Sequence, residues 1–344
     1  MRKLLFISAL VLIASFAQAQ TVGSISGKVI DSKTKGGIPG ASVYLAHTTI
    51  GVSANADGTF TLDKIPNGKY DLTVSMIGYK IFSRPIAFDG NSIVDFTIQL
   101  EENTVLLDSV VIKARRIKDS NRGYIQFQKM FLGETKNSYQ CSILNRKDIT
   151  VFFEGRKLHA YASKPIIIEN KALGYKISYE LSEFEVDYEL NTQIISGIAR
   201  FEELTPESAK QKNKWAKERD RAYYGSINHF FQTLKKRTLS QSHYILQNEN
   251  GVFISEKEII NNDIVKYKGK INILYTSEIP EFVRAGRPQS GQSSDITFSG
   301  KPIKVYDNGY YEDFHDISID GYLVWISKMA DVVPYDYSPS KQLK

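Results

Sequence analysis

The sequence predicts a multidomain chain in which an N-terminal all-β sandwich is followed by a β-rich α+β domain with one long helix. Three observations support this fold class. The first third of the chain consists of short β-rich runs separated by turn residues. A helical pattern at 206–237 is flanked by further strand-like runs. The length of 344 residues, 42% of them hydrophobic, suits about two domains with cores of their own.

Residues 1–19 have the pattern of a cleavable secretory signal. Arg2 and Lys3 precede an apolar run at 4–16, and Ala17-Gln18-Ala19 supplies small residues at the cleavage positions. An uncleaved anchor is the alternative, but the run is shorter than the ~20 residues of a membrane-spanning helix. No Cys follows, so a lipoprotein anchor is not indicated. We expect an exported protein without an integral membrane span after cleavage, located in the periplasm or at the outer membrane or cell surface.

Charge and cysteine content exclude two classes of protein. The formal net charge of +6 includes the two basic residues of the signal and is otherwise spread without a basic block, so no nucleic-acid partner is expected. Cys141 is the only cysteine, so an internal disulfide cannot form. We expect Cys141 to be a small buried hydrophobic residue.

The first domain, 20–114, shows strand-like runs at 26–30, 41–45, 58–62 and 70–75, separated by Gly-, Pro- and Asn-containing turns. This spacing predicts an antiparallel sandwich. Asp57-Gly58 predicts a hairpin turn, since glycine tolerates positive φ. Tyr70, Leu72 and Val74 alternate with polar residues, which places them on one buried face.

Residues 22–113 also carry motifs of a known family, in order: Gly27-Lys28-Val29, Ile38-Pro39-Gly40-Ala41-Ser42-Val43, Asn55-Ala56-Asp57-Gly58-Thr59-Phe60, Ile65-Pro66-Asn67-Gly68-Lys69-Tyr70 and Ile77-Gly78-Tyr79. They resemble the carboxypeptidase regulatory-like domain. The resemblance implies a seven-stranded, transthyretin-like sandwich that is not itself catalytic. In Gram-negative bacteria, similar domains begin outer-membrane receptors that import glycans, with a strand like 107–114 leading onward.

After a charged linker at 115–120, the α+β domain, 121–344, begins with a predicted helix at 121–131, capped by Asp119 or Ser120 and ended by Gly133. Strands are then expected at 151–153, 158–161, 166–168, 175–181 and 184–188. In the last of these, Glu183, Glu185, Asp187 and Glu189 alternate with apolar residues, which predicts a solvated acidic face. A cation site is the alternative interpretation of these acids.

The long helix expected at 206–237 carries the candidate ligand-binding residues, which fall on or beside one stripe of its surface: Trp215, Arg219, Tyr223, Ser226 and His229. In the alternative interpretation, Trp215 and Tyr223 dock the helix on a sheet while the polar members make structural hydrogen bonds. Gly225 weakens the helix and permits a bend.

The last third of the chain is again read as strands, at 259–267, 270–275 and 317–327, with a loop at 280–300. The segment 306–314 is rich in Tyr, Asp and Gly, a combination that can bind sugars because aromatic faces stack on pyranose rings. Further cues are the run Phe131-Leu132-Gly133-Glu134, the run Pro165-Ile166-Ile167-Ile168-Glu169-Asn170-Lys171-Ala172-Leu173-Gly174-Tyr175, and the helix at 215–231 with Arg219, Ala222-Tyr223 and Gly225-Ser226. Through these cues residues 121–344 resemble a domain that follows a regulatory-like sandwich in many secreted proteins of Gram-negative bacteria, and this resemblance implies no particular chemistry.

The motifs of several hydrolases are missing. None of the five histidines begins a His-x-x-Glu or His-Glu-x-x-His pair, and no Gly-x-Ser-x-Gly elbow occurs. We therefore expect no catalytic residues, metal or cofactor, and interpret the chain as an exported binding or scaffold protein of the cell envelope. Its partner would be an outer-membrane or cell-surface protein or a glycan. The alternatives are a glycan-active hydrolase of unrecognised type and an accessory subunit of an outer-membrane receptor that pairs a sandwich edge by strand addition.

Overall fold

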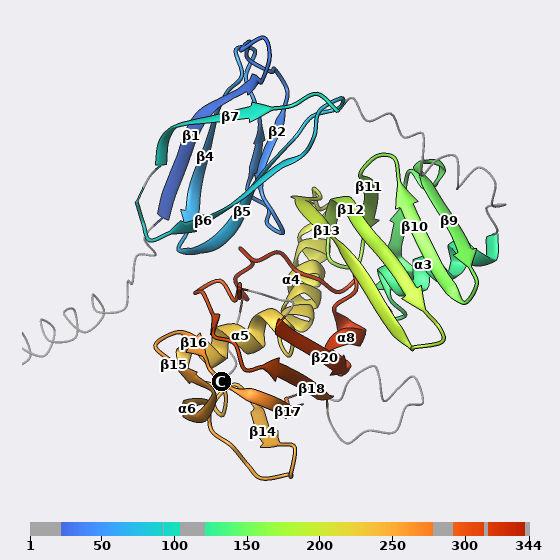
Figure 1. Ribbon diagram of the computed structural model, residues 1–344, viewed down its shortest axis with the longest axis vertical. Helices are drawn as coiled ribbons and strands as arrows, with labels where there is room; N and C mark the ends of the chain where they lie inside the picture. The colour runs from blue at the N-terminus through green and yellow to red at the C-terminus, as the bar shows by residue number, and fades with distance from the viewer. Residues whose placement is uncertain (1–21, 92, 104–120, 278–291, 313–315, 341–344) are drawn as a thin grey trace, which may run out of the picture.

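The computed structural model describes residues 22–91, 93–103, 121–277, 292–312 and 316–340 (Figure 1). Hydrophobic side chains within these ranges form three clusters, centred on three successive regions of the chain. The expected signal peptide, the strand at 107–114 and the linker at 115–120 lie outside the described residues.

The first region, 22–100, is a sandwich of two β-sheets that enclose one hydrophobic cluster. One sheet has the order β4-β1-β7, formed by β1 (Val22–Asp31), β4 (Thr59–Pro66) and β7 (Ile93–Leu100). The other has the order β3-β2-β5-β6, formed by β2 (Ser42–Leu45), β3 (Gly51–Ser53), β5 (Gly68–Ser75) and β6 (Phe82–Phe88). Tyr70, Leu72 and Val74 are buried, as their alternation predicts. The N-terminal sandwich is confirmed.

Two details of the sandwich differ from the prediction. β1 pairs with β7 in parallel, so the sandwich is not purely antiparallel. A parallel pair needs a long connection, which the five intervening strands supply. Asp57-Gly58 does form a tight turn, with Gly58 at φ +85°, but this turn joins β3 and β4 of opposite sheets and is not a hairpin. The local sequence determines that the chain turns at Asp57-Gly58, whereas long-range strand pairing determines which sheet each flanking strand joins.

The second region is a six-stranded antiparallel sheet with α3 (Asn121–Leu132) packed against it. Its strands are β8 (Cys141–Ile143), β9 (Ile149–Glu154), β10 (Lys157–Ala162), β11 (Ile166–Asn170), β12 (Tyr175–Asp187) and β13 (Thr192–Glu203). Short 3-10 turns lie at Ser138–Gln140 and Arg146–Asp148. Phe127 of α3 contacts Phe184 of β12, with ring centroids 4.9 Å apart. The helix predicted at 121–131 is confirmed.

The sequence is misread at three points in this region. The two strands expected at 175–181 and 184–188 are the single strand β12, and its partner β13 was not predicted. Asp187 is buried instead of lying on a solvated acidic face, because its carboxylate accepts the backbone N–H groups of Glu189 and Leu190 at the turn into β13. Cys141 is half-buried, not fully buried.

The predicted long helix at 206–237 is two helices, α4 (Ala209–Tyr223) and α5 (Ile227–Lys236). The break lies at Gly225, whose φ of +81° is incompatible with a continuing helix and strained for residues other than glycine. Ser226 then caps α5, since its hydroxyl accepts the backbone N–H of His229. α5 buries Phe230, Phe231 and Leu234 in the third hydrophobic cluster.

The third region contains a four-stranded sheet with the order β14-β17-β18-β20 and a three-stranded sheet with the order β15-β16-β19. Its elements are β14 (Tyr244–Asn248), α6 (Glu256–Ile259), β15 (Ile260–Asn261), β16 (Ile264–Val265), β17 (Lys268–Tyr275), β18 (Gln292–Ser299), β19 (Ile303–Lys304), β20 (Ile317–Gly321) and α8 (Tyr322–Ile326). Among the described residues, none of the helices is long and apolar enough to span a bilayer.

In the third region, only the run at 270–275 is a strand along its whole length, as predicted. The run at 259–267 is the end of α6 and two short strands, and the run at 317–327 divides into β20 and α8. The expected loop at 280–300 includes strand β18, while residues 278–291 lie outside the described ranges. Short apolar runs do not distinguish strand from helix, which explains these errors.

The C-terminal segment 329–340 passes between the sandwich, the second region and α4 (Figure 1). The backbone N–H of Met329 bonds to the carbonyl of Phe131, next to the second region's sheet. The N–H of Tyr335 bonds to the carbonyl of His47 in the sandwich, at 2.8 Å. The hydroxyl of Tyr337 donates to Asp220 of α4, at 2.6 Å. One segment therefore contacts the sandwich, the second region and α4.

Candidate functional site

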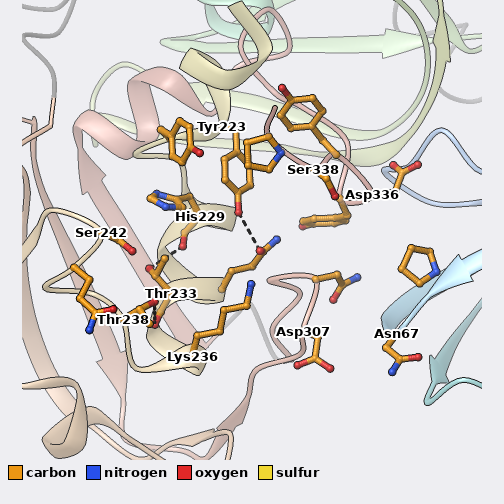
Figure 2. A pocket seen from close by; sticks show the side chains of 18 of the residues that line it. Asn67, Tyr223, His229, Thr233, Lys236, Thr238, Ser242, Asp307, Asp336 and Ser338 are labelled. Carbon is orange, nitrogen blue, oxygen red and sulfur yellow. Dashed lines mark hydrogen bonds between the residues drawn. The ribbon is translucent and has the colours of Figure 1, made fainter. Parts of the chain in front are cut away.

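A pocket of about 850 Å³ lies where the sandwich meets the C-terminal half of the chain (Figure 2). Its walls come from four places: the β4–β5 turn, the α4–α5 break with α5 and the segment after it, the turn after β19, and the C-terminal segment. We call this cavity the junction pocket. These places are far apart in sequence, so their proximity is a product of the tertiary fold.

The helix break places Tyr223 and His229 on one wall of the junction pocket (Figure 2). The backbone N–H of Gly225 donates to Nδ1 of His229 at 3.1 Å, so the ring proton of the neutral imidazole lies on Nε2. The hydroxyl of Tyr244 also lies 3.0 Å from Nδ1. Burial lowers the pKa of His229 to about 3, so this side chain is uncharged at neutral pH.

Tyr223 is held by a short chain of hydrogen bonds. Its hydroxyl donates to Oε1 of Gln232 at 3.0 Å, and Nε2 of Gln232 donates to Oδ1 of Asn228 at 3.2 Å. Burial raises the pKa of Tyr223, which keeps the phenol protonated. This wall of the pocket is therefore preorganised, neutral and polar.

Trp215 and Arg219 do not line the junction pocket. Nε1 of Trp215 donates to the carbonyl of Lys171 at 2.9 Å. Arg219 donates from Nε to the carbonyl of Leu173 at 2.7 Å and from Nη2 to that of Gly174 at 3.1 Å. Both residues thus hold the turn between β11 and β12 against α4. Of the five candidate residues, Tyr223 and His229 reach the pocket, Ser226 caps α5, and Trp215 and Arg219 fix this turn.

Sequence reasoning missed most of the pocket wall, although Asp307 and Asn308 lie in the segment 306–314 that it named as a possible sugar-binding segment. Asn308 donates from Nδ2 to the carbonyl of Lys69 at 2.7 Å, which joins the turn after β19 to the sandwich. Asp336 accepts hydrogen bonds from the backbone N–H and the hydroxyl of Thr49, and burial raises the pKa of its carboxyl. Asp307 is exposed and pairs with Lys235 at 3.3 Å. No periodic pattern marks any of these residues.

The tyrosine-rich segment 306–314, considered above as a possible sugar-binding segment, contacts the sandwich. Nζ of Lys69 lies 2.5 Å from Oε1 of Glu312, and 5.3 and 5.6 Å from the ring centroids of Tyr306 and Tyr310. Tyr311 stacks on Phe231, with centroids 4.3 Å apart. These rings are therefore engaged in contacts within the chain. Phe314 lies outside the described residues.

The two remaining kinds of site to consider are a metal site and a reactive thiol at Cys141. Within the described ranges, no group of three or more His, Cys, Asp or Glu side chains could hold a metal ion. Sγ of Cys141 lies 3.4 Å from the carbonyl oxygen of Asn137, and burial raises the pKa of the thiol to about 12. This thiol is therefore protonated at neutral pH and a weak nucleophile.

The seven described strands and their two-sheet arrangement place the N-terminal region among the β-sandwich modules. A family model, that of the CarboxypepD_reg-like domain, matches residues 25–112. The N-terminal region is a CarboxypepD_reg-like domain, and the match does not extend to the rest of the chain. No curated protein matches the chain.

Partial likenesses to solved structures accompany this match. The group B streptococcus pilus 2b backbone protein is 20% identical, with 24% of this chain and 42% of that chain covered and a TM-score of 0.21. Catechol 1,2 dioxygenase of Acinetobacter radioresistens is 13% identical, with 27% and 55% covered and a TM-score of 0.22. A streptococcal ancillary pilin is 17% identical, with 25% and 30% covered and a TM-score of 0.20. The chain thus spans about half or less of these proteins, and we infer nothing about its function from them.

Proposed function

We propose that this chain is an exported, non-catalytic binding protein of the cell envelope whose ligand occupies the junction pocket. The pocket itself carries the proposal. Its volume of about 850 Å³ falls within the range of sites that bind small molecules. Domain junctions are a common location for such sites, and this pocket is built by the sandwich together with the C-terminal half of the chain.

The sandwich contributes Pro66, Asn67 and Tyr70 to the pocket wall and is held against the rest of the chain partly by backbone hydrogen bonds of its β2–β3 loop. The N–H of His47 donates to the carbonyl of Ala199 at 2.6 Å, and the N–H of Phe201 donates to the carbonyl of Thr48 at 3.0 Å. Nη1 of Arg200 donates to Oγ of Ser42 at 2.5 Å. A wall held in this way reduces the ordering that ligand binding requires.

Hydrolysis of a glycan remains the second candidate, since Asp307 and Asp336 line the same pocket. Their surroundings favour binding over catalysis. Thr49 holds the carboxylate of Asp336 through its N–H and hydroxyl, and Asp307 is exposed next to Lys235. Both carboxyl groups are therefore already engaged by partners within the chain.

Strand addition to an outer-membrane receptor is disfavoured at two of the four edge strands of the sandwich, β6 and β7. β6 is the last strand of its sheet and carries Arg84 and Pro85 in its centre. β7 ends the other sheet, and Asp95 within it adopts a φ of +57°. Charge, proline and irregular backbone on edge strands oppose pairing with another chain. The pocket is therefore the better candidate for the binding surface.

Ligand-induced stabilisation tests the pocket. We expect some compound in a panel of oligosaccharides, short peptides and nucleotides to raise the melting temperature by about 5 °C at 100-fold excess over its Kd. Ser242→Trp, which fills the pocket, should abolish the shift, while Ser240→Trp should retain it, because Ser240 is exposed and does not line the pocket. A panel in which no compound distinguishes these two variants would contradict the proposal.

The export component has its own test. Ala17 and Ala19 occupy the cleavage positions, so N-terminal sequencing of protein recovered from the cell envelope should begin at Gln20. An Ala17→Glu/Ala19→Glu variant should keep the leader. Recovery of wild-type protein in the cytosol with Met1 intact would show that the N-terminal segment is not a cleaved signal.

A further inference from the structure

We propose that the junction pocket recognises a neutral oligosaccharide. This inference rests on the function proposed above and names the chemical class of the ligand. The lining combines three features that together suit a sugar chain: aromatic rings, uncharged hydrogen-bonding side chains and few charges.

The first feature is a set of partly accessible aromatic rings. Tyr224, Tyr335 and Tyr337 line the pocket and are half-buried. Each ring also contacts a ring of the chain, Tyr224 that of His229, Tyr335 that of Tyr310 and Tyr337 that of Tyr223. Tyr337 is anchored at its hydroxyl by Asp220, and Tyr335 at its backbone by His47. An aromatic ring offers an apolar face and a polar end, and the face suits the C–H groups on one side of a pyranose. Anchored rings lose little conformational freedom when a ligand binds.

The second feature is a run of uncharged hydrogen-bonding groups along the segment that follows α5. Thr238, Gln241 and Ser242 line the pocket there. Gln241 is exposed and Ser242 is half-buried, and neither side chain has a hydrogen-bond partner among the residues that the structure describes. Amides and hydroxyls both donate and accept, as sugar hydroxyls do, so these groups can pair with a ligand in which every hydroxyl plays both roles.

The third feature is the charge on the lining. Lys236, Asp307 and Asp336 are its charged members, and His229 is uncharged because burial lowers its pKa. A phosphorylated ligand would call for clustered Arg and Lys side chains, yet Lys236 is the one basic side chain among the described lining residues apart from the neutral histidine. An apolar ligand would call for aliphatic walls, and the described lining has none beyond Pro66 and Pro339.

A peptide is the other polar chain to consider. Extended peptides bind mainly by adding a strand to an exposed sheet edge, where the backbone supplies hydrogen bonds. The junction pocket is lined by turns, a helix and the C-terminal segment, with Pro66 the last residue of the edge strand β4. Side chains therefore supply most of its hydrogen-bonding groups, and this arrangement favours a sugar over an extended peptide.

Calorimetric titration of the full chain tests the inference. The probes are the hexasaccharides of β-1,4-glucose, β-1,4-mannose, β-1,4-xylose and α-1,4-glucose, with hexaalanine and inorganic phosphate for comparison. We expect at least one hexasaccharide to bind with one-to-one stoichiometry, and neither hexaalanine nor phosphate to bind. Gln241→Ala/Ser242→Ala should weaken sugar binding at least about tenfold, because it removes two unpartnered polar side chains. Ser240→Ala, at a neighbouring exposed position outside the pocket, should leave the Kd unchanged.

The outcomes separate the two proposals. Binding of hexaalanine or phosphate that Ser242→Trp abolishes, without binding of any hexasaccharide, would overturn the sugar assignment and leave the pocket as a ligand site. Sugar binding that the alanine pair does not weaken would place the sugar elsewhere and overturn the inference. Failure of every probe in both assays would overturn the proposed function as well. If mass spectrometry showed that a bound hexasaccharide becomes shorter, the result would support recognition of the sugar in the pocket. It would also show that the protein is an enzyme.

Discussion

Replacing Trp215 with alanine is expected to lower the free energy of unfolding by about 3 to 5 kcal/mol, the range for large aromatic truncations in cores. Trp215 is 5% exposed and, with Tyr223, is one of two buried residues on α4. Its indole ring packs on the turn before β12, where a Cβ added to Gly174 would lie 2.3 Å from Cδ2 of the ring. The variant would remove this contact and leave the carbonyl of Lys171 without its indole donor.

The midpoint of denaturant unfolding, followed by far-ultraviolet circular dichroism, measures this effect. Lys214→Ala is the matched control, since Lys214 is the exposed neighbour of Trp215 on α4 and its loss should change stability by less than about 0.5 kcal/mol. A midpoint for Trp215→Ala equal to that of the control would show that the indole is not a docking group. It would also restore the interpretation of Trp215 as part of a ligand surface.

Local patterns predicted those elements in which side-chain periodicity and burial agree. Tyr70, Leu72 and Val74 alternate on β5, and all three are buried. The helix at 121–131 was predicted because Tyr124, Phe127 and Phe131 recur at helical spacing, and each is buried against the second region's sheet. In both cases one face of the element meets a core, so the period in the sequence reports the structure directly.

β12 shows how a bulge misleads a period-two pattern. Tyr175, Ile177 and Tyr179 are buried at odd positions, whereas Phe184 and Val186 are buried at even ones. The change of parity indicates the end of one strand and the start of another. The structure instead has one continuous strand whose pairing register with β13 shifts between Leu181 and Glu183. This irregularity changes the buried side chains from odd-numbered to even-numbered positions without ending the strand.

The break between α4 and α5 could have been predicted from the sequence, although Gly225 alone was not sufficient evidence for it. A glycine inside a helix costs up to about 1 kcal/mol relative to alanine, which long helices tolerate. The stronger signal was Ser226 directly before the apolar positions of α5, because serine there is a typical N-cap. Reading Gly225-Ser226 as a stop followed by a cap would have separated the two helices.

The junction pocket was not predictable as a unit. Tyr223 and His229 were found because they share a helical stripe, but Asn67, Asp307 and Tyr335 belong to turns and to the C-terminal segment. Such segments have no period, and their approach depends on how the three hydrophobic clusters are placed. The Tyr-rich segment at 306–314 suggested stacking on a sugar, but in the structure Nζ of Lys69 lies over the rings of Tyr306 and Tyr310.

Replacing Arg219 with alanine is expected to cost on the order of 3 kcal/mol of stability. Its guanidinium makes two charge-assisted hydrogen bonds to the carbonyls of Leu173 and Gly174, each worth roughly 1.5 to 3 kcal/mol in a partly buried setting. It also lies 4.0 Å from the ring centroid of Tyr175, a cation–π contact. The expected loss is smaller than the summed energies of these contacts, because the turn can relax and water can reach the two carbonyls in the variant.

Two further variants separate the causes of this effect. Arg219→Lys keeps the charge but cannot form the planar fork, so its unfolding midpoint should lie between those of the wild type and Arg219→Ala. Glu203→Gln should change stability by less than about 0.5 kcal/mol, because Glu203 is 60% exposed and water screens its ion pair with Arg219. A large effect of Glu203→Gln together with a full rescue by lysine would assign the stabilisation to charge pairing. The structure predicts the opposite order, because the guanidinium's partners nearest the core are the two backbone carbonyls.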